Sequence, residues 1–339
     1  RLCAVWLSMR AEQRPEVRSK ILQAIAEAPI AATADTPSTE TQAAKQSSAP
    51  AATATQKVVY WAAAPDAELA DMAHEVLSNY HAQRRDLFGR IGLAESEWKA
   101  LAAYYAPRWA IHTAGPQDRL GRPVLRNGHT AIDHETPVVH YQVGYARAGG
   151  QTLVQIQYFA WFGGDDPNHF GGLVWRVTLD ANGQPLVYDS IGMRGREHLW
   201  FPVHSLEIAT GAHPTIPQAP ISAGTPQLWL QSQSHRVRQV DAVQGGARPD
   251  AGHYALRRYE RLFTLEAGAD DTQSLFDPTG RVRGTGVQGA GLYHLSRLSL
   301  APGEPWYFDD PDLLRHNFVL PASAVKASGH DQPERHTTN

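Results

Sequence analysis

The sequence predicts an α+β protein, in which a predominantly antiparallel β-sheet or sandwich follows an N-terminal pair of packing helices. Three observations carry this prediction. Between residues 137 and 208, five segments alternate apolar and polar side chains, and short turn-rich stretches join them. Before them, residues 66–106 hold two segments with apolar side chains at helical spacing. Residues 31–56 consist almost wholly of Ala, Thr, Ser, Pro, Gln and Lys, without apolar periodicity.

The first 56 residues are predicted to lie outside the folded domain. Residues 1–30 are predicted to be an N-terminal helix or the remnant of a truncated signal or anchor. The helix prediction rests on residues 10–27, and the alternative rests on the apolar stretch Leu2-Cys-Ala-Val-Trp-Leu7. Residues 31–56 are predicted to be a disordered linker, because so few apolar side chains cannot offset the entropy of ordering the chain.

A single α+β domain is predicted over residues 57–323. Pro65 and Asp66 signal the start of the first helix, and the second runs from about Ala94 to Pro107. Residues 109–320 read mainly as strand and loop. The last residues, 324–339, are predicted to be a disordered tail.

The central strands follow each other along residues 137–208. Val139 to Tyr145 and Val154 to Phe162 alternate apolar and polar side chains, which is typical of half-buried strands. A loop over residues 163–172 leads to the strand that begins at Leu173. The Asn182-Gly183 pair predicts a tight hairpin, because these residues readily adopt positive φ angles. Short connections predict an antiparallel meander.

Beyond the meander the pattern is less regular. Leu228, Leu230, Val237 and Val240 predict one more long strand. The segment from Tyr254 to Leu265 fits either a short helix or an edge strand, since its apolar residues match both periods.

Composition limits the classes of function. With 19% charged residues and a formal net charge of -3, the chain has no basic face of the kind that nucleic acids require. The single cysteine, Cys3, rules out an intrachain disulfide and a multi-cysteine zinc site. No apolar run reaches the length of a membrane span, so the predicted contact with a membrane is limited to an anchor at the N-terminus.

Histidine provides one candidate site. The chain has sixteen histidines, of which seven fall between His112 and His204. His198 and His204 are expected on one face of a strand, and His140 on the polar face of another. Three histidines, or two with a carboxylate, form the ligand set of catalytic zinc. Asp189 and Glu197 are the candidate catalytic carboxylates. The alternative is that these histidines are polar-face or hydrogen-bonded side chains of an ordinary sheet.

The loop at residues 163–172 is a second candidate site. It carries Asp165, Asp166 and His169 between two glycine pairs. Carboxylates on such a loop bind Ca²⁺ or act as a general acid or base. The alternative is a long surface hairpin without a ligand.

Three tryptophans in the meander form a third candidate site. Trp161, Trp175 and Trp200 are predicted either to offer an aromatic platform for a sugar or other planar ligand or to fill the core. Aromatic residues in strands are more often core.

Several segments resemble a set of uncharacterised bacterial proteins, many of them exported or lipid-anchored. The resemblance covers about residues 100 to 320. It rests on Asp118-Arg-Leu-Gly-Arg-Pro123, on the strand Pro137-Val-Val-His-Tyr141, on the hairpin Gly172-Leu-Val-Trp-Arg-Val-Thr-Leu-Asp-Ala-Asn-Gly-Gln-Pro185 and on Tyr188-Asp-Ser-Ile191. After this hairpin the similar proteins carry a Cys-Gly-Cys-Tyr element, whereas this chain reads Gly192-Met-Arg-Gly-Arg-Glu-His198. If that element binds metal or acts in redox chemistry, this chain has lost it or uses His198 in its place.

Two functions follow as hypotheses. The first is a non-enzymatic bacterial envelope protein that binds a small molecule, a glycan or a protein partner through the loops 163–172 and 192–198. The second is a metal-dependent hydrolase with a histidine site on the central sheet. The resemblance implies a periplasmic or cell-envelope location, and the low cysteine content is equally compatible with the cytoplasm.

Overall fold

The computed structural model places the chain from Lys57 to Val325, with short gaps. It describes residues 57–126, 128–164, 169–203, 205–210, 212, 220–222, 224–246, 248–267, 271–285, 287, 300 and 307–325. Contacts between Cα atoms divide the chain into two units, residues 1–53 and 54–339. All described residues belong to the second unit. The predictions for residues 1–30 and 31–56, and for the tail beyond Val325, lie outside the described residues.

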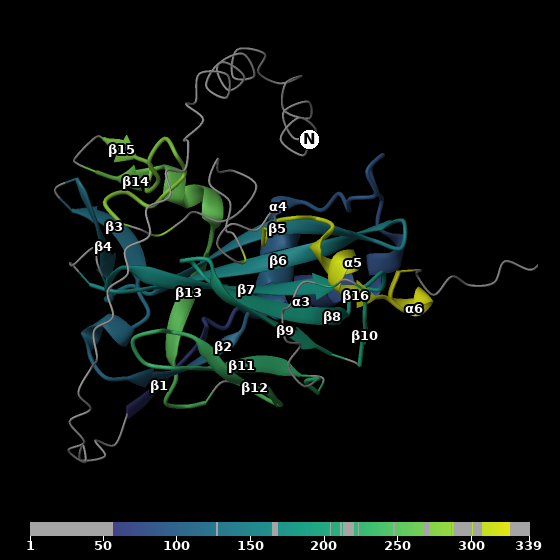
Figure 1. Cartoon of the computed structure of the whole chain (residues 1–339), viewed down its shortest axis with the longest axis horizontal. Coiled ribbons are helices and arrows are strands. Elements are labelled where there is room, and N and C mark those ends of the chain that lie inside the picture. The colour runs from purple at the N-terminus through teal and green to yellow at the C-terminus, as the bar shows by residue number, and fades with distance from the viewer. Residues whose placement is uncertain are drawn as a thin grey trace, which may run out of the picture. The chain divides into compact units, whose positions relative to one another are not determined.

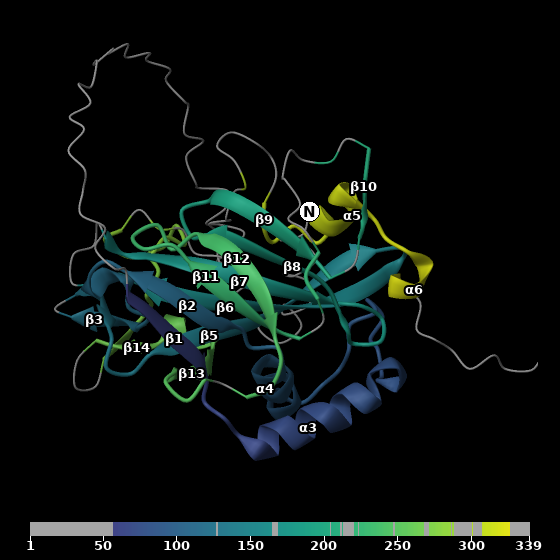
Figure 2. The ribbon, with the colours of Figure 1, turned by 90° about the horizontal axis from the view of Figure 1, so that it is seen from below.

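Two helices precede the main strands, where the sequence predicts them. Helix α3 spans Ala67–Ser78, and the Asp66 carboxylate caps it by accepting a hydrogen bond from the Leu69 amide at 3.2 Å. Helix α4 spans Glu95–Tyr104 and stops before Pro107. Both helices pack against the same face of the sheet (Figure 2).

Among the described residues, one ten-stranded sheet organises the domain, in the order β12-β11-β2-β1-β13-β5-β6-β7-β8-β9 (Figure 1). Five consecutive strands form the predicted antiparallel meander: β5 Val138–Ala148, β6 Gln151–Phe162, β7 Gly171–Leu179, β8 Pro185–Gly192 and β9 Arg196–Pro202. The other half comprises β1 Lys57–Ala63, β2 Arg108–Thr113, β11 Thr225–Leu230, β12 Val237–Val243 and β13 Gly252–Arg258.

The half of the sheet outside the meander differs from the sequence prediction in two places. The expected long strand from Leu228 to Val240 is instead the antiparallel hairpin β11–β12, since a turn at residues 231–236 reverses the chain. The segment from Tyr254 to Leu265 is mainly strand β13 followed by the 3₁₀ helix η4, Tyr259–Phe263. Strand β13 is central, because it pairs in parallel with both β1 and β5. Strands β2 and β11 also pair in parallel.

Smaller elements surround the sheet. The short strands form three separate ladders: β3 Arg122–Arg126 with β4 His129–Asp133, β10 Glu207–Ile208 with β16 Phe318–Val319, and β14 Leu265–Glu266 with β15 Thr272–Gln273. The remaining helices are short: η1 Tyr80–Ala82, η2 Pro116–Asp118, α5 Leu313–Asn317 and α6 Ala322–Val325. Ala324 and Val325 are buried in α6, so the ordered domain extends two residues past the predicted boundary.

Both faces of the meander are buried, which corrects the prediction of half-buried strands. One face packs under α3 and α4 through residues such as Tyr158 and Trp175. The opposite face, which carries the alternate residues such as Phe159 and Val174, is covered by η4, α5 and α6. Polar residues of the alternating pattern such as Gln142, Arg176 and Asp189 therefore lie inside the protein, where burial without a hydrogen-bonding partner is costly.

The fold class is confirmed: the domain is β-rich α+β, with a predominantly antiparallel sheet and an N-terminal pair of packing helices. In the described part of the chain, no helix is long and apolar enough to cross a membrane.

The Asn-Gly hairpin provides a test of the packing between helices and sheet. Gly183 has a φ of +81°, and an added Cβ would lie 2.8 Å from the Tyr80 ring. We expect Gly183→Ala to lower the free energy of unfolding by about 2–3 kcal/mol, since strain and overpacking add. Gly150→Ala is the matched control, because Gly150 has a φ of +76° but open space around its Cα. Urea denaturation should show the larger loss at Gly183, and equal losses would contradict the packing argument.

Candidate functional site

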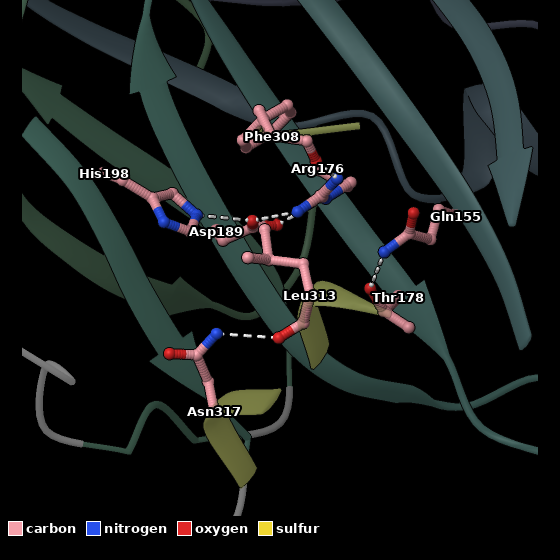
Figure 3. Close-up of polar contacts among 8 residues, drawn as sticks. All are labelled: Gln155, Arg176, Thr178, Asp189, His198, Phe308, Leu313 and Asn317. Atoms are coloured by element: carbon pink, nitrogen blue, oxygen red, sulfur yellow. Dashed lines mark hydrogen bonds and ion pairs between the residues drawn. The ribbon is translucent and has the colours of Figure 1, made fainter. Parts of the chain in front are cut away.

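A buried cluster of Arg176, Asp189 and His198 lies on the face of the meander that the C-terminal segment covers (Figure 3). Strand β7 supplies Arg176, β8 supplies Asp189 and β9 supplies His198. Arg176 Nε donates to Asp189 Oδ1 at 2.8 Å and its Nη2 donates to Asp189 Oδ2. His198 Nε2 lies 2.8 Å from Asp189 Oδ2, and the acceptor-only carboxylate makes this nitrogen the donor.

The cluster joins the sheet to the C-terminal segment. Arg176 Nη1 donates to the carbonyl oxygen of Phe308, and the guanidinium carbon lies 3.8 Å from the centre of the Phe308 ring. The His198 ring packs at 4.6 Å against Trp200 and at 5.5 Å against Phe308. The Arg176 guanidinium thus makes a bidentate ion pair, a backbone hydrogen bond and a cation–π contact.

Burial decides what this cluster can do. The side chains of Arg176, Asp189 and His198 are 1%, 0% and 2% exposed. Burial alone would raise the pKa of Asp189, but the Arg176 charge and the hydrogen bonds from His198 and Arg176 outweigh it and hold the pKa below its ordinary value. The cluster is therefore an ionised structural link, closed to a substrate in this conformation.

The cluster belongs to a row of polar side chains that crosses the meander. Gln142, Gln157, Arg176 and Asp189 lie directly opposite one another on adjacent strands. Gln155 on the next rung donates to Thr178 Oγ1 at 3.0 Å (Figure 3). Both polar atoms of the Gln142 amide are buried without a protein hydrogen-bond partner. The polar positions of the alternating sequence pattern therefore form this buried row.

The structure does not bring His140 and His198 together. They lie on β5 and β9, with three strands between them, roughly 19 Å apart along the sheet at about 4.8 Å per strand. His140 instead accepts a hydrogen bond at Nδ1 from Trp161 Nε1, at 3.2 Å. His204 lies outside the described residues. Within the described ranges, no three His, Cys, Asp or Glu side chains gather as a metal-ligand group.

The remaining predicted site residues are dispersed. Asp165 and Asp166 lie outside the described residues, and His169 is exposed at the end of the 163–172 loop. Glu197, in a positive-φ conformation, pairs with Arg236 at 3.0 Å on the surface.

The three predicted platform tryptophans are core residues. Trp161 and Trp175 are 0% exposed and Trp200 is 1% exposed. Trp175 stacks on Tyr188 at 5.3 Å, and Trp200 packs edge-on against Phe318 at 5.2 Å. Their rings therefore present no open face to a ligand.

A second buried acid–histidine pair, Asp118 and His235, lies at the C-terminal end of β6, beside Phe162. The Asp118 carboxylate accepts hydrogen bonds from the amides of Ala114 and Gln233 and from His235 Nε2, the last at 3.1 Å. The His235 ring stacks on Phe162, with ring centres 4.0 Å apart. Burial lowers the pKa of His235 to about 4 although Asp118 opposes the shift, so the ring is neutral near pH 7.

An open cleft of about 980 Å³ lies between strand β3, together with residues 135–138, and the β13–η4–β14 segment. Strand β14 lies beside β3 at this end of the domain (Figure 1). Apolar wall positions include Pro123, Val124, Leu125, Val138, Ala255 and Leu265. The acidic, basic and histidine side chains of the wall are Arg122, Glu135, His140, His253, Arg257, Arg261 and Glu266.

The charges of this cleft are of both signs and mostly unpaired. Arg122 pairs with Asp133 at 2.8 Å. Within the described part of the chain, Arg257, Arg261, Glu135 and Glu266 make no ion pair, with one another or with any other residue. Burial, reinforced by the Arg257 charge, lowers the pKa of His140 to about 3, so this wall residue is neutral.

The sequence contains one indication of this cleft, which is separate from the histidine and loop candidates. Arg257, Arg258 and Arg261 fall within five positions, between Tyr254 and Phe263. Arg258 pairs with Glu260 at 3.0 Å, which leaves the other two arginines for the cleft.

Comparison of the chain with protein-family models, with curated proteins and with solved structures gives no match.

Proposed function

We propose that this domain is a binding protein for a small zwitterionic molecule, an amino acid or a short peptide, and that the cleft beside β13 is its site. One observation carries the proposal: two arginines and two glutamates line the same hollow without pairing. Opposite charges that share a cleft but do not touch leave a gap that a ligand with both charges can bridge.

The cleft also fits such a ligand in size and lining. Ligand sites commonly enclose about 300–1,000 Å³ and combine apolar walls with a few polar groups. This cleft has a volume of about 980 Å³. A carboxylate would bind Arg257 and Arg261, because the planar guanidinium donates two parallel hydrogen bonds. An ammonium group would bind Glu135 or Glu266, and an aliphatic side chain would pack on Leu125 and the other apolar wall residues.

The binding hypothesis drawn from the sequence is thus kept, with its site moved from the loops 163–172 and 192–198 to this cleft. The first of these loops begins beside β4, since Gly164 accepts a hydrogen bond from the Ile132 amide at 3.3 Å, and β4 pairs with β3, which lines the cleft. An envelope location for the binding protein rests on the resemblance described above. Fractionation of cells that express the natural gene with a C-terminal tag would test that location.

The binding test compares three matched probes by titration calorimetry: leucyl-leucine, its N-acetylated form and its C-terminal amide. We expect leucyl-leucine to bind tightest, because each blocked form loses one charge contact worth about tenfold or more in affinity. Arg257→Gln with Arg261→Gln should weaken leucyl-leucine by a similar factor while leaving the amide almost unaffected. Glu135→Gln with Glu266→Gln should show the reverse preference, losing discrimination against the N-acetylated form.

Arg238→Gln is the control variant, since Arg238 is exposed on β12 and does not line the cleft. It should bind all three probes as the unmodified protein does. Equal binding of the three probes, or no binding of any, would count against a zwitterion site. Loss of binding in the control as well would show a general effect of charge.

A further inference from the structure

The turn from Arg84 to Arg90, between η1 and α4, holds two large apolar side chains in water. Leu87 is 101% exposed and Phe88 is 53% exposed. These two adjacent residues are among the most exposed large apolar residues of the described chain. Arg84 is exposed, and Arg85 and Arg90 are partly exposed beside them. Such a combination requires explanation, because exposed leucine and phenylalanine pairs invite aggregation.

Hydrogen bonds hold this turn in one conformation. The Asp86 carboxylate accepts hydrogen bonds from the amides of Phe88 and Arg90, at 2.8 Å and 3.0 Å. Arg85 Nη1 donates to the carbonyl oxygens of Gly89 and Thr152, at 2.8 Å and 3.2 Å. Thr152 Oγ1 donates to the Phe88 carbonyl at 2.6 Å. The turn is therefore fixed to the β5–β6 hairpin, and this bracing fixes the backbone at Leu87 and Phe88 while their side chains stay in water.

The charge around the tip is positive. Residues 84–90 contain three arginines, Arg84, Arg85 and Arg90, and one acidic residue, Asp86, which pairs with Arg90. The Arg90 guanidinium also lies over the Phe88 ring, 5.2 Å from its centre. Arg84 makes no ion pair within the described residues. Two apolar side chains flanked by arginines are complementary to the acyl region and the headgroups of an anionic lipid surface.

We propose that residues 84–90 form a docking turn that inserts Leu87 and Phe88 into an anionic membrane surface. A protein partner fits less well, because a stable protein interface needs about 800 Å² on each side and some twenty residues. Lipid binding has no such area requirement, because it grows with the apolar surface inserted and with the attraction of adjacent cations to anionic headgroups. This proposal is independent of the ligand cleft.

The experiment uses the full chain with Cys3→Ser and Leu87→Cys, labelled with a polarity-sensitive NBD fluorophore. Vesicles contain equal parts of phosphatidylglycerol and phosphatidylcholine, or phosphatidylcholine alone. We expect a blue-shifted, brighter emission with the anionic vesicles, which high salt reverses. The matched control carries the label at Ile208→Cys, an exposed apolar position next to Glu207, and should not respond.

Vesicle sedimentation of unlabelled full-length variants measures the size of the effect. Leu87→Ala with Phe88→Ala should lower partitioning into anionic vesicles by about tenfold or more. Arg84→Gln should lower it by about fivefold, whereas Arg238→Gln should not change it. The proposal is overturned if the label at position 87 does not respond to anionic vesicles, or responds equally to neutral ones. It is also overturned if the response follows protein concentration without lipid, which would identify self-association through the turn.

Discussion

Asp189→Asn is expected to lower the free energy of unfolding by about 3–5 kcal/mol, the largest effect of any single substitution proposed here. The asparagine is nearly isosteric, so little packing is lost. It leaves the Arg176 charge buried without a counter-ion, and it removes the carboxylate that holds His198. Chemical denaturation monitored by tryptophan fluorescence measures the loss, since Trp175 and Trp200 lie in the same sheet.

Two further variants separate the buried charge from other effects. Asp250→Asn removes an ion pair in which the Arg248 and Asp250 side chains are 53% and 61% exposed, and should change stability far less than Asp189→Asn because solvent screens the pair. Arg176→Met combined with Asp189→Asn should be much less destabilised than the sum of the two single variants, because it leaves no unpaired buried charge. Additive losses, or an Asp189→Asn loss as small as that of the control, would contradict the assignment of this cluster.

Local signals explain which parts of the fold the sequence predicts. The Asp66 cap, the stop before Pro107 and the Asn182-Gly183 turn act within a few residues, and each is confirmed, although only Gly183 of the pair adopts a positive φ. The position of β13 between β1 and β5 has no such signal, because its parallel partners are far away in the chain. The second apolar layer is equally hidden, since it is assembled from η4, α5 and α6, whose own periodicity is too short to read.

The sites were harder to predict for the same reason. Period-2 alternation shows that His140, Asp189 and His198 lie on the strand face opposite the main apolar residues. It does not show that a second apolar layer buries that face. Shared orientation also says nothing about lateral separation, and three strands lie between His140 and His198. The cleft depends on strands brought together by parallel pairing, so Arg257 and Glu135 become neighbours only in the folded chain.

Acid is expected to destabilise the domain from about pH 6.5 downwards through two buried histidines. Burial lowers the pKa of His140 to about 3 and that of His235 to about 4, whereas histidine in an unfolded chain titrates near pH 6.5. Above pH 6.5 both states are neutral and these residues add no pH dependence. Between about pH 6.5 and 4 the unfolded chain binds protons that the folded chain excludes, so stability falls as the pH falls.

The expected slope is up to about 1.4 kcal/mol per pH unit for each histidine. It flattens for His235 below about pH 4, where the folded ring also takes up its proton. Asp189 acts in the same direction but only at lower pH, because its pKa is held below the ordinary value of a carboxyl group, so its contribution is lost near and below about pH 4. The window from pH 6.5 to 4.5 is therefore dominated by histidine.

Glutamine at each position separates titration from hydrogen bonding. In His235→Gln the amide can still donate to Asp118, and in His140→Gln its oxygen can still accept from Trp161, but neither side chain titrates. Urea denaturation between about pH 4.5 and 7.5 should show a shallower slope in each variant and the shallowest in the double variant. His253→Gln, at an exposed position, is the control and should keep the original slope. An unchanged slope in the double variant would mean that other groups carry the acid sensitivity and that His140 and His235 are accessible to protons in the folded state.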